Sequence, residues 1–477
     1  MAKAKEPEQN NPYLTGLFAP VRDEVTAFDL PVTGQIPHAL NGRYLRNGPN
    51  PLGIEDPATH HWFTGAGMVH GVRLREGRAE WYRNRWVRSA KVAEHLGEKP
   101  LGGPVHQGMD FAPNTHILRF AGRNLATVEA GALPYELDDD LGTIGPYDFQ
   151  GTLPGGFAAH TILDPDSGEL HAVAYCWAYP YVQYLVVGLD GRIKRQVDVP
   201  VEGSPMMHDF SLTQRHVLLY DLPVGFSMDI AEKGGSFPYA WNPEKQARLG
   251  VLPRAGGARS VRWFDIDPCF VFHPMNAYES DDGRRIVVDL VRYERLFDSG
   301  SAGPDETLPC LERWTVDLAA GVVHREQLDD RPLEFPRIDP RRASGEHRYG
   351  YAVLEPEDGF GEARAKRHIA DAAGEPKTPE TDAIGQGLVK YDLLNGTSEV
   401  HRMPAGADIG EGVFVPADED AAEDDGYVIA FTFDPDRDAS DLVILAAQDI
   451  AAGPVARVHL PARVPAGFHG NWMPDED

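Results

Sequence analysis

Short hydrophobic runs recur along this chain at intervals of roughly a dozen residues, and turn-forming residues separate them. Residues 116–120 and 125–129 flank a turn at Gly122, which predicts a β-hairpin. Residues 170–177 and 182–188 predict a second hairpin. Because convincing helical periodicity is scarce between such runs, the pattern predicts an all-β protein built from many short strands.

Later hydrophobic runs continue this pattern to the end of the chain. Further strands are predicted at 217–222, 285–291, 311–317, 349–354, 388–392, 427–433 and 442–447. Many short strands are typical of sandwiches and propellers, and no linker divides the chain. A single β-propeller domain over residues 1–477, with roughly seven blades, therefore fits the length best. Residues 230–249 are interpreted as a long connection and 356–384 as a surface excursion.

Composition narrows the functional classes. Acidic residues outnumber basic ones by 73 to 45, a formal charge of −28, which argues against binding nucleic acid. Cys176, Cys269 and Cys310 include no C-x-x-C pair and fit a reducing cytoplasm. Residues 1–11 are polar and predict a flexible tail without a secretory signal. No apolar run reaches membrane-spanning length, so we expect a cytoplasmic protein.

Four histidines are candidate metal ligands. His160, His208, His273 and His469 sit in apolar, strand-like segments, whereas most other histidines lie beside charges or in turns. Their separations of 48, 65 and 196 residues give no local metal-ligand spacing. The interpretation is one ligand from each of four blades, all pointing at a propeller axis. Each histidine alone also fits an ordinary core position with one satisfied ring nitrogen.

These segments resemble the carotenoid cleavage oxygenase family, and the likeness runs nearly from end to end. The matching stretches, besides those around the four histidines, are 42–50, 62–70, 112–115, 128–131, 133–135, 334–337, 347–351, 410–416 and 468–472. The resemblance implies a seven-bladed β-propeller under a dome of loops and short helices. It also implies a non-haem Fe(II) on the axis, with His160, His208, His273 and His469 as ligands.

The resemblance further implies three glutamates that hold the ligands. Glu129 would serve His208, Glu334 would serve His273 and Glu411 would serve His469. A ligating imidazole needs one bare nitrogen, and a carboxylate that accepts the other N–H fixes the tautomer. The competing interpretation, a buried glutamate paired with arginine, is possible for Glu334, because Arg337 lies nearby, and less natural for Glu129 and Glu411.

The implied reaction inserts O2 across one electron-rich C=C bond and gives two carbonyl products. Thr115 matches the family position that crowds one of the iron's remaining coordination positions. Candidate residues for an apolar substrate tunnel adjoin a ligand or a supporting glutamate, although each also fits a core position: Val128, Met207, Phe272 and Phe335.

Two alternatives to carotenoid cleavage stay open at this point. Stilbene-cleaving relatives, which act on substrates of the lignostilbene, resveratrol or isoeugenol type, usually carry lysine where this chain has Val128. Valine there favours a carotenoid or apocarotenoid. A metal-free propeller acting as a binding scaffold is the alternative from another class. Finally, the apolar residues within 222–228 and 237–241 predict peripheral membrane contact, with buried packing as the competing interpretation.

Overall fold

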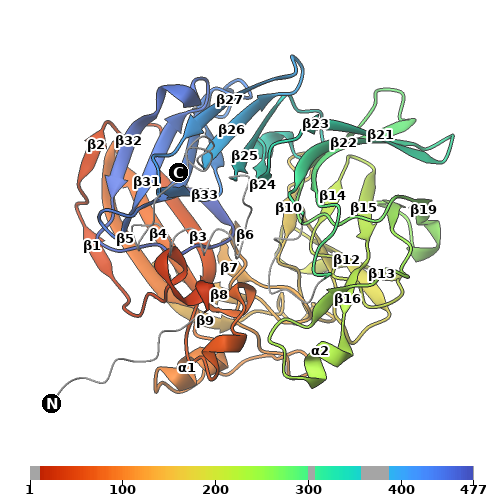
Figure 1. Ribbon diagram of the computed structural model, residues 1–477, viewed down its shortest axis with the longest axis horizontal. Coiled ribbons are helices and arrows are strands. Elements are labelled where there is room, and N and C mark those ends of the chain that lie inside the picture. The colour runs from red at the N-terminus through yellow and green to blue at the C-terminus, as the bar shows by residue number, and fades with distance from the viewer. Residues whose placement is uncertain (1–10, 299–306, 356–385, 476–477) are drawn as a thin grey trace.

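A computed structural model describes residues 11–298, 307–355 and 386–475. The described chain is almost entirely β, and seven antiparallel sheets surround a central axis (Figure 1). The seven-bladed propeller predicted from the sequence is confirmed. The proposed tail, apart from Asn11, and the proposed excursion at 356–384 lie outside the described residues.

Each blade is an antiparallel sheet, and in most blades four strands follow one another in the chain. The first blade contains β1 (Thr26–Phe28), β3 (Gly42–Asn50), β4 (Ala66–Arg75), β5 (Arg78–Trp86) and β33 (Gly470–Pro474). The second contains β6 (His116–Phe120), β7 (Arg123–Thr127), β8 (Tyr135–Leu137) and β9 (Thr143–Pro146). The third contains β10 (Thr161–Leu163), β11 (Leu170–Ala174), β12 (Tyr181–Val187) and β13 (Ile193–Pro200).

The next blades repeat this arrangement. The fourth contains β14 (Phe210–Leu212), β15 (His216–Asp221), β18 (Arg248–Pro253) and β19 (Arg262–Asp265). The fifth contains β20 (Pro274–Glu279), β21 (Arg285–Arg292), β22 (Cys310–Asp317) and β23 (Val322–Asp329). The sixth contains β24 (Leu333–Arg337), β25 (Tyr349–Leu354), β26 (Gly387–Asp392) and β27 (Thr397–Arg402).

A strand from the N-terminal part of the chain completes the seventh blade, and the C-terminal strand completes the first. The seventh contains β2 (Val32–Gly34), β28 (Asp408–Ile409), β29 (Val413–Pro416), β30 (Gly426–Asp434), β31 (Ala439–Ala446) and β32 (Pro454–His459). N-terminal β2 pairs with β32, and C-terminal β33 pairs with β3, so red and blue strands lie together in Figure 1. These pairings close the ring and fix the segment just before β33, which carries His469.

Blades stack face to face, so their middle strands are buried on both sides. β3 is buried at all nine positions, including Leu45 and the polar Asn47. Asn47 donates to the carbonyls of Pro113 and His116 in the next blade, which satisfies its amide without water. The alternation of hydrophobic and polar residues is therefore weak in these strands, because both faces pack against protein.

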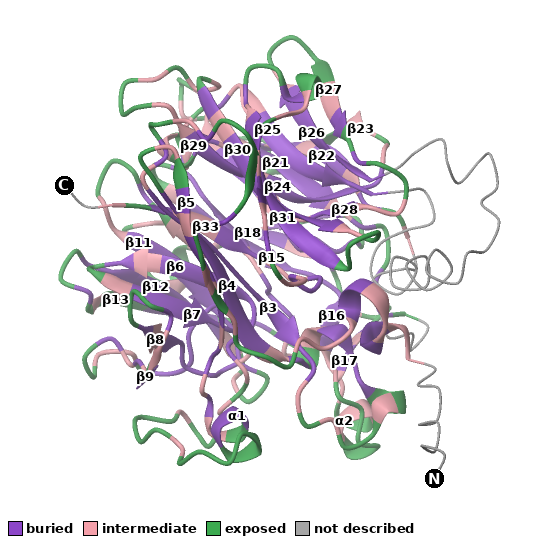
Figure 2. Ribbon diagram, turned by 90° about the vertical axis from the view of Figure 1, so that its left-hand side faces the viewer, coloured by how far each residue is buried: buried purple, intermediate pink, exposed green. Residues whose placement is uncertain are grey.

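Two short helices lie at the same end of the molecule, α1 (Ala90–His95) and α2 (Met228–Glu232) (Figure 2). The predicted connection at 230–249 contains the end of α2, β17 (Tyr239–Trp241) and the first residues of β18. β17 pairs with β16 (Val224–Phe226) in a hairpin beside α2. Within the described ranges, no helix has the length and apolar character needed to cross a membrane.

Candidate metal centre

All four predicted histidines directly precede the innermost strand of a blade. His160 comes before β10, His273 before β20 and His469 before β33, while Asp209 alone separates His208 from β14. Strands of successive blades begin at the same end of a propeller axis, so residues at their starts converge. Each of the four rings is buried.

The convergence is close enough for one shared ion. One ligand atom of each histidine lies within 4.8 Å of the ligand atoms of the other three. His208 Nε2 lies 3.0 Å from His160 Nε2 and 3.2 Å from His273 Nε2. Ring nitrogens that ligate a transition metal at about 2.0–2.1 Å have separations of this size.

The opposite nitrogens of three rings contact carboxylates. His208 Nδ1 lies 2.7 Å from Glu129, His273 Nδ1 2.6 Å from Glu334, and His469 Nδ1 2.9 Å from Glu411. These pairs are the ones that the family resemblance implied. An ionised carboxylate only accepts hydrogen bonds, so each Nδ1 carries the proton and each Nε2 presents a bare lone pair to the axis.

Bare lone pairs 3.0 Å apart repel each other unless a cation lies between them. The donor set of this structure therefore fits a metal ion, and imidazole nitrogen suits iron as well as zinc, copper and nickel. Three carboxylates around the rings would offset the charge of a divalent ion.

Burial lowers the pKa of two of the four histidines. Burial lowers the pKa of His160 well below its usual range, and the nearby His469 and His208 lower it further. Burial likewise lowers the pKa of His469 to about 4, although Glu411 opposes this shift. At His273 burial acts in the same direction, but the Glu334 carboxylate outweighs it and the pKa is raised. Neutral imidazole is the form that ligates metal.

The competing interpretation of Glu334 as an arginine partner is wrong. Arg337 lies 3.3 Å from Glu411, and Glu334 instead accepts from Tyr293 at 3.0 Å. A β-bulge in β24 separates the two residues, and Phe335 within it has φ of 55°, the left-handed region. The bulge turns the chain so that Glu334 and Phe335 both face the histidines. Phe335 stacks on His273 with ring centroids 5.5 Å apart.

Two residues that sequence reasoning missed also contact the cluster. Asp209 Oδ2 lies 3.4 Å from Nδ1 of His160, the ring that has no glutamate partner among the described pairs. The second residue is His116, whose ring centroid lies 5.4 Å from that of His469. Its Nε2 accepts a hydrogen bond from Asn471 at 2.9 Å. Both residues adjoin a predicted site residue in sequence, and that adjacency was the only signal for them.

A large cavity of about 1350 Å³ reaches the rings of His208, His273 and His469. Predicted site residues Thr115, Val128, Phe272 and Phe335 all line it, beside further aromatic residues: Trp62, Phe63, Phe111, Tyr175, Trp177, Phe226, Phe237, Tyr239, Tyr293 and Phe468. Its volume exceeds the roughly 300–1,000 Å³ of ordinary ligand pockets. An extended apolar molecule therefore fits this space.

Met207, which the sequence predicted as a tunnel residue, does not contact the cavity. Its side chain is 1% exposed in the hydrophobic core. Val128, in contrast, does line the cavity. It lies after the end of β7 at Thr127, and the chain turns at Ala130, where φ is 63°.

Thr115 positions His469 through its backbone. Its carbonyl accepts from the His469 N–H at 3.1 Å, and its own N–H donates to Thr127. The side-chain hydroxyl donates to Asn114 Oδ1 at 3.1 Å. Thr115 thus belongs to the cavity wall and also fixes the segment that carries one histidine.

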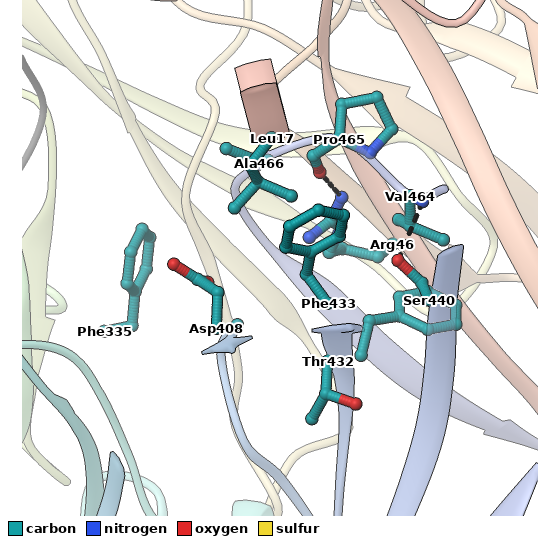
Figure 3. Close-up of a pocket in the computed structure, with 13 residues that line it drawn as sticks. Leu17, Arg46, Phe335, Asp408, Thr432, Phe433, Ser440, Val464, Pro465 and Ala466 are labelled. Atoms are coloured by element: carbon teal, nitrogen blue, oxygen red, sulfur yellow. Dashed lines mark hydrogen bonds between the residues drawn. The ribbon is translucent and has the colours of Figure 1, made fainter. Parts of the chain in front are cut away.

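A separate pocket of about 20 Å³ lies behind Phe335 and shows how the C-terminal segment is fixed (Figure 3). Arg46 of β3 donates to the carbonyl of Pro465. A Cβ atom at Gly467 would lie 2.7 Å from the Arg46 guanidinium carbon, so a side chain there would require the guanidinium to move.

Comparison with known proteins agrees with this geometry. Residues 18–474 match the family described as retinal pigment epithelial membrane protein. The chain is 47% identical to the carotenoid cleavage oxygenase of Mycobacterium tuberculosis, over 99% of this chain and 100% of that protein. It belongs to the carotenoid cleavage oxygenase family.

Other members show the chemical range of the family. Isoeugenol monooxygenase of Pseudomonas putida is 33% identical, with 98% of each chain covered. The crystal structure of Pseudomonas brassicacearum lignostilbene dioxygenase superposes with a TM-score of 0.84 at 28% identity, covering 99% of this chain and 100% of that one. This chain is accordingly an oxidoreductase that incorporates oxygen, and the alternative of a metal-free binding scaffold is excluded.

We expect Glu411→Gln to weaken metal binding about 10- to 100-fold. Glu411 accepts from His469 Nδ1 and from the Gly470 N–H, both at 2.9 Å, and an amide keeps only one of its two acceptor atoms. The dissociation constant for Fe(II), measured anaerobically by competition with a chromophoric chelator, checks this. The control is Glu279→Gln, since Glu279 also contacts a histidine, His216 at 2.9 Å, away from the cluster. Equal affinity in both variants would contradict the role given to Glu411.

Proposed function

We propose that His160, His208, His273 and His469 bind one Fe(II), and that the enzyme cleaves a C=C bond of a carotenoid or apocarotenoid with O2. The alkene and one O2 are consumed, and two carbonyl compounds, aldehydes or ketones, are formed without an external reductant. The supporting observation is that one cavity joins three of the four histidine rings to a long aromatic wall. When bound, the iron supplies the activation of O2.

The chain's own residues prepare the site for this reaction. Glu129, Glu334 and Glu411 hold the imidazole protons on Nδ1, so that all three rings keep Nε2 free. Phe272 and Phe335 pack against His208 and His273, with centroid distances of 5.2 and 5.5 Å, and exclude water there. The Thr115 side chain limits the space beside the cluster.

Apolar walls orient the alkene. Phe63 contacts Phe237, Phe272 and Phe468 with ring centroids 5.3, 6.1 and 5.5 Å apart. Such aromatic surfaces bind a conjugated chain through its flat faces and leave it free to slide along its length. The position of cleavage therefore depends on what stops the substrate at its ends.

A second candidate function is cleavage of stilbenes or phenylpropenoids at the same centre. Relatives named isoeugenol monooxygenase and lignostilbene dioxygenase support it. Against it, Val128 lines the cavity beside Glu129 and offers no base for a phenolic hydroxyl.

We also propose that the cavity mouth contacts lipid to collect its substrate. The structure buries Leu222, Val224, Tyr239 and Trp241 of the two apolar segments, which corrects the expectation that both are exposed. Met228 of α2 is 53% exposed, and Trp177 and Phe111 are each 39% exposed where they line the cavity. Met228 lies two residues after Phe226, which lines the cavity, and exposed apolar residues near such a cavity suit transfer of an apolar molecule from a membrane.

Replacing His208 or His273 by alanine should remove iron and activity together. Loss of one ligand costs more than the 10- to 100-fold of a supporting residue, so affinity should fall about a hundredfold or more. Iron per chain after anaerobic loading and O2-dependent product formation measure the two effects. His401→Ala, a buried histidine outside the cluster, is the control. Full iron occupancy with turnover in both variants would refute the ligand set.

Val128→Lys should lower the kcat/KM for an apocarotenal by about tenfold or more, because an ammonium group in this wall is costly to desolvate. Val128→Met, similar in length but uncharged, should retain most of the activity. Both variants are assayed with an apocarotenal and with 4-hydroxystilbene. A gain on the stilbene would strengthen the tunnel-wall role, whereas unchanged rates on both substrates would place Val128 away from the substrate.

Met228→Asp should reduce flotation with neutral phosphatidylcholine vesicles several-fold, since it places a charge where an apolar side chain would enter the lipid. Neutral vesicles avoid repulsion of a chain with formal charge −28. Leu394→Asp is the matched control, because Leu394 is 75% exposed in the turn before β27, at the opposite end from α2 (Figure 2). Absence of binding in the wild-type protein, or equal loss in both variants, would end the lipid proposal.

A further inference from the structure

Two tyrosines form a polar patch in the apolar wall of the large cavity. Tyr175 directly follows β11 in the third blade, and Tyr239 begins β17 in the hairpin beside α2. Their ring centroids lie 6.2 Å apart with planes at 82°. Both rings are buried and line the cavity together with Glu129.

The hydroxyl groups of these tyrosines hold their protons at neutral pH. Burial raises the pKa of Tyr175 well above its usual range, and the Glu129 carboxylate and the Tyr239 hydroxyl raise it further. Burial, followed by Glu129, also raises the pKa of Tyr239. Each hydroxyl is therefore a hydrogen-bond donor in the resting protein.

Tyr239 has no acceptor for this proton. Its Oη is buried beside the Tyr175 hydroxyl, and no residue that the structure describes accepts a hydrogen bond from it. Tyr293, another tyrosine of the same cavity, donates to Glu334 at 3.0 Å. A buried hydroxyl without a partner is destabilising, so its retention here points to a ligand that completes the hydrogen bond.

Packing alone does not require the Tyr239 hydroxyl. The ring contacts Phe226 and Phe237, with centroid distances of 5.7 and 5.3 Å, and phenylalanine would make the same contacts. What tyrosine adds is one hydroxyl donor in the cavity wall, beside the Tyr175 hydroxyl and the Glu129 carboxylate. A single donor in an apolar wall recognises a single oxygen atom.

We propose that Tyr239, beside Tyr175, donates a hydrogen bond to an oxygen of the olefin substrate, and that the enzyme thereby selects oxygenated olefins over hydrocarbons. A carbonyl or hydroxyl oxygen at one end of the molecule supplies the acceptor. This inference rests on the proposed function, because it assigns the substrate of the same cavity. It makes Tyr239 a specificity-determining residue.

The location of the patch indicates where the oxygen-bearing end of the substrate would lie in the cavity. Glu129 joins the patch to the centre, since its carboxylate contacts His208 and lies near the Tyr175 hydroxyl. An oxygen held at Tyr239 therefore fixes one end of the substrate on the His208 side of the cavity. A hydrocarbon leaves the Tyr239 hydroxyl unpaired and lacks this anchor, and sites of this type reject such analogues.

Anaerobic binding tests the inference separately from catalysis, because the iron-loaded enzyme cannot turn over without O2. Dissociation constants are measured by tryptophan fluorescence quenching for two pairs: an apocarotenal with its deoxygenated hydrocarbon, and 4-hydroxystilbene with stilbene. The wild type should bind at least one oxygenated member about five- to tenfold more tightly than its hydrocarbon. Tyr239→Phe should reduce that ratio to near one, with little change in hydrocarbon binding.

Tyr391→Phe is the control for removal of a buried tyrosine hydroxyl. Tyr391 donates to Asp329 at 2.7 Å in the sixth blade, so its loss should affect stability but not the binding ratio. A wild-type ratio near one for both pairs would overturn the inference whether or not any variant folds. An unchanged ratio in Tyr239→Phe would overturn it as well. Failure of alkene cleavage in air, with the anaerobic ratio intact, would count against the proposed function alone.

Discussion

The hydrogen bond between a buried imidazole and a buried carboxylate is the interaction on which this site depends. It decides which ring nitrogen carries the proton, and therefore which nitrogen faces the axis. At His208, His273 and His469 the bond is 2.6–2.9 Å long, too short for a water molecule to intervene. Removing a carboxylate would free the ring to take the other tautomer and to turn its lone pair away.

The propeller supplies these bonds because each blade begins at the same end of the axis. From the first blade to the seventh, the residues at or beside the innermost strand are His469, Thr115, His160, His208, His273, Glu334 and Glu411. The four ligands thus come from four different blades, and no two ligands depend on one loop. Closure of the ring by β33 also places His469, so overall folding and site assembly are coupled.

The four ligands could be predicted from the sequence, since each lies in a short apolar, strand-like segment, but the innermost strands that follow them were not predicted. The three glutamate pairings came only from the family resemblance, because they join residues 58 to 79 positions apart. The partner of Arg337 could not be predicted, because the bulge at Phe335 reverses the expected facing of side chains. Met207 was misplaced for a related reason: adjacency to a ligand does not set the direction of a side chain.

Tyr239 marks the limit of sequence reasoning more clearly. It lies 31 residues after His208 in a hairpin outside the blade meanders, whereas Glu129, whose carboxylate raises its pKa, follows β7 of the second blade. No local pattern identifies a tyrosine whose hydroxyl lacks a partner. Only the three-dimensional arrangement shows that the cavity wall combines an aromatic surface with one polar anchor.

Whether the four histidines hold one iron is the central question of this account, and X-ray absorption of the iron-loaded, anaerobic protein answers it most directly. We predict one iron per chain, four imidazole nitrogens at about 2.1 Å and the multiple-scattering pattern of histidine rings. A shell dominated by oxygen, or with two or fewer imidazoles, would contradict the account.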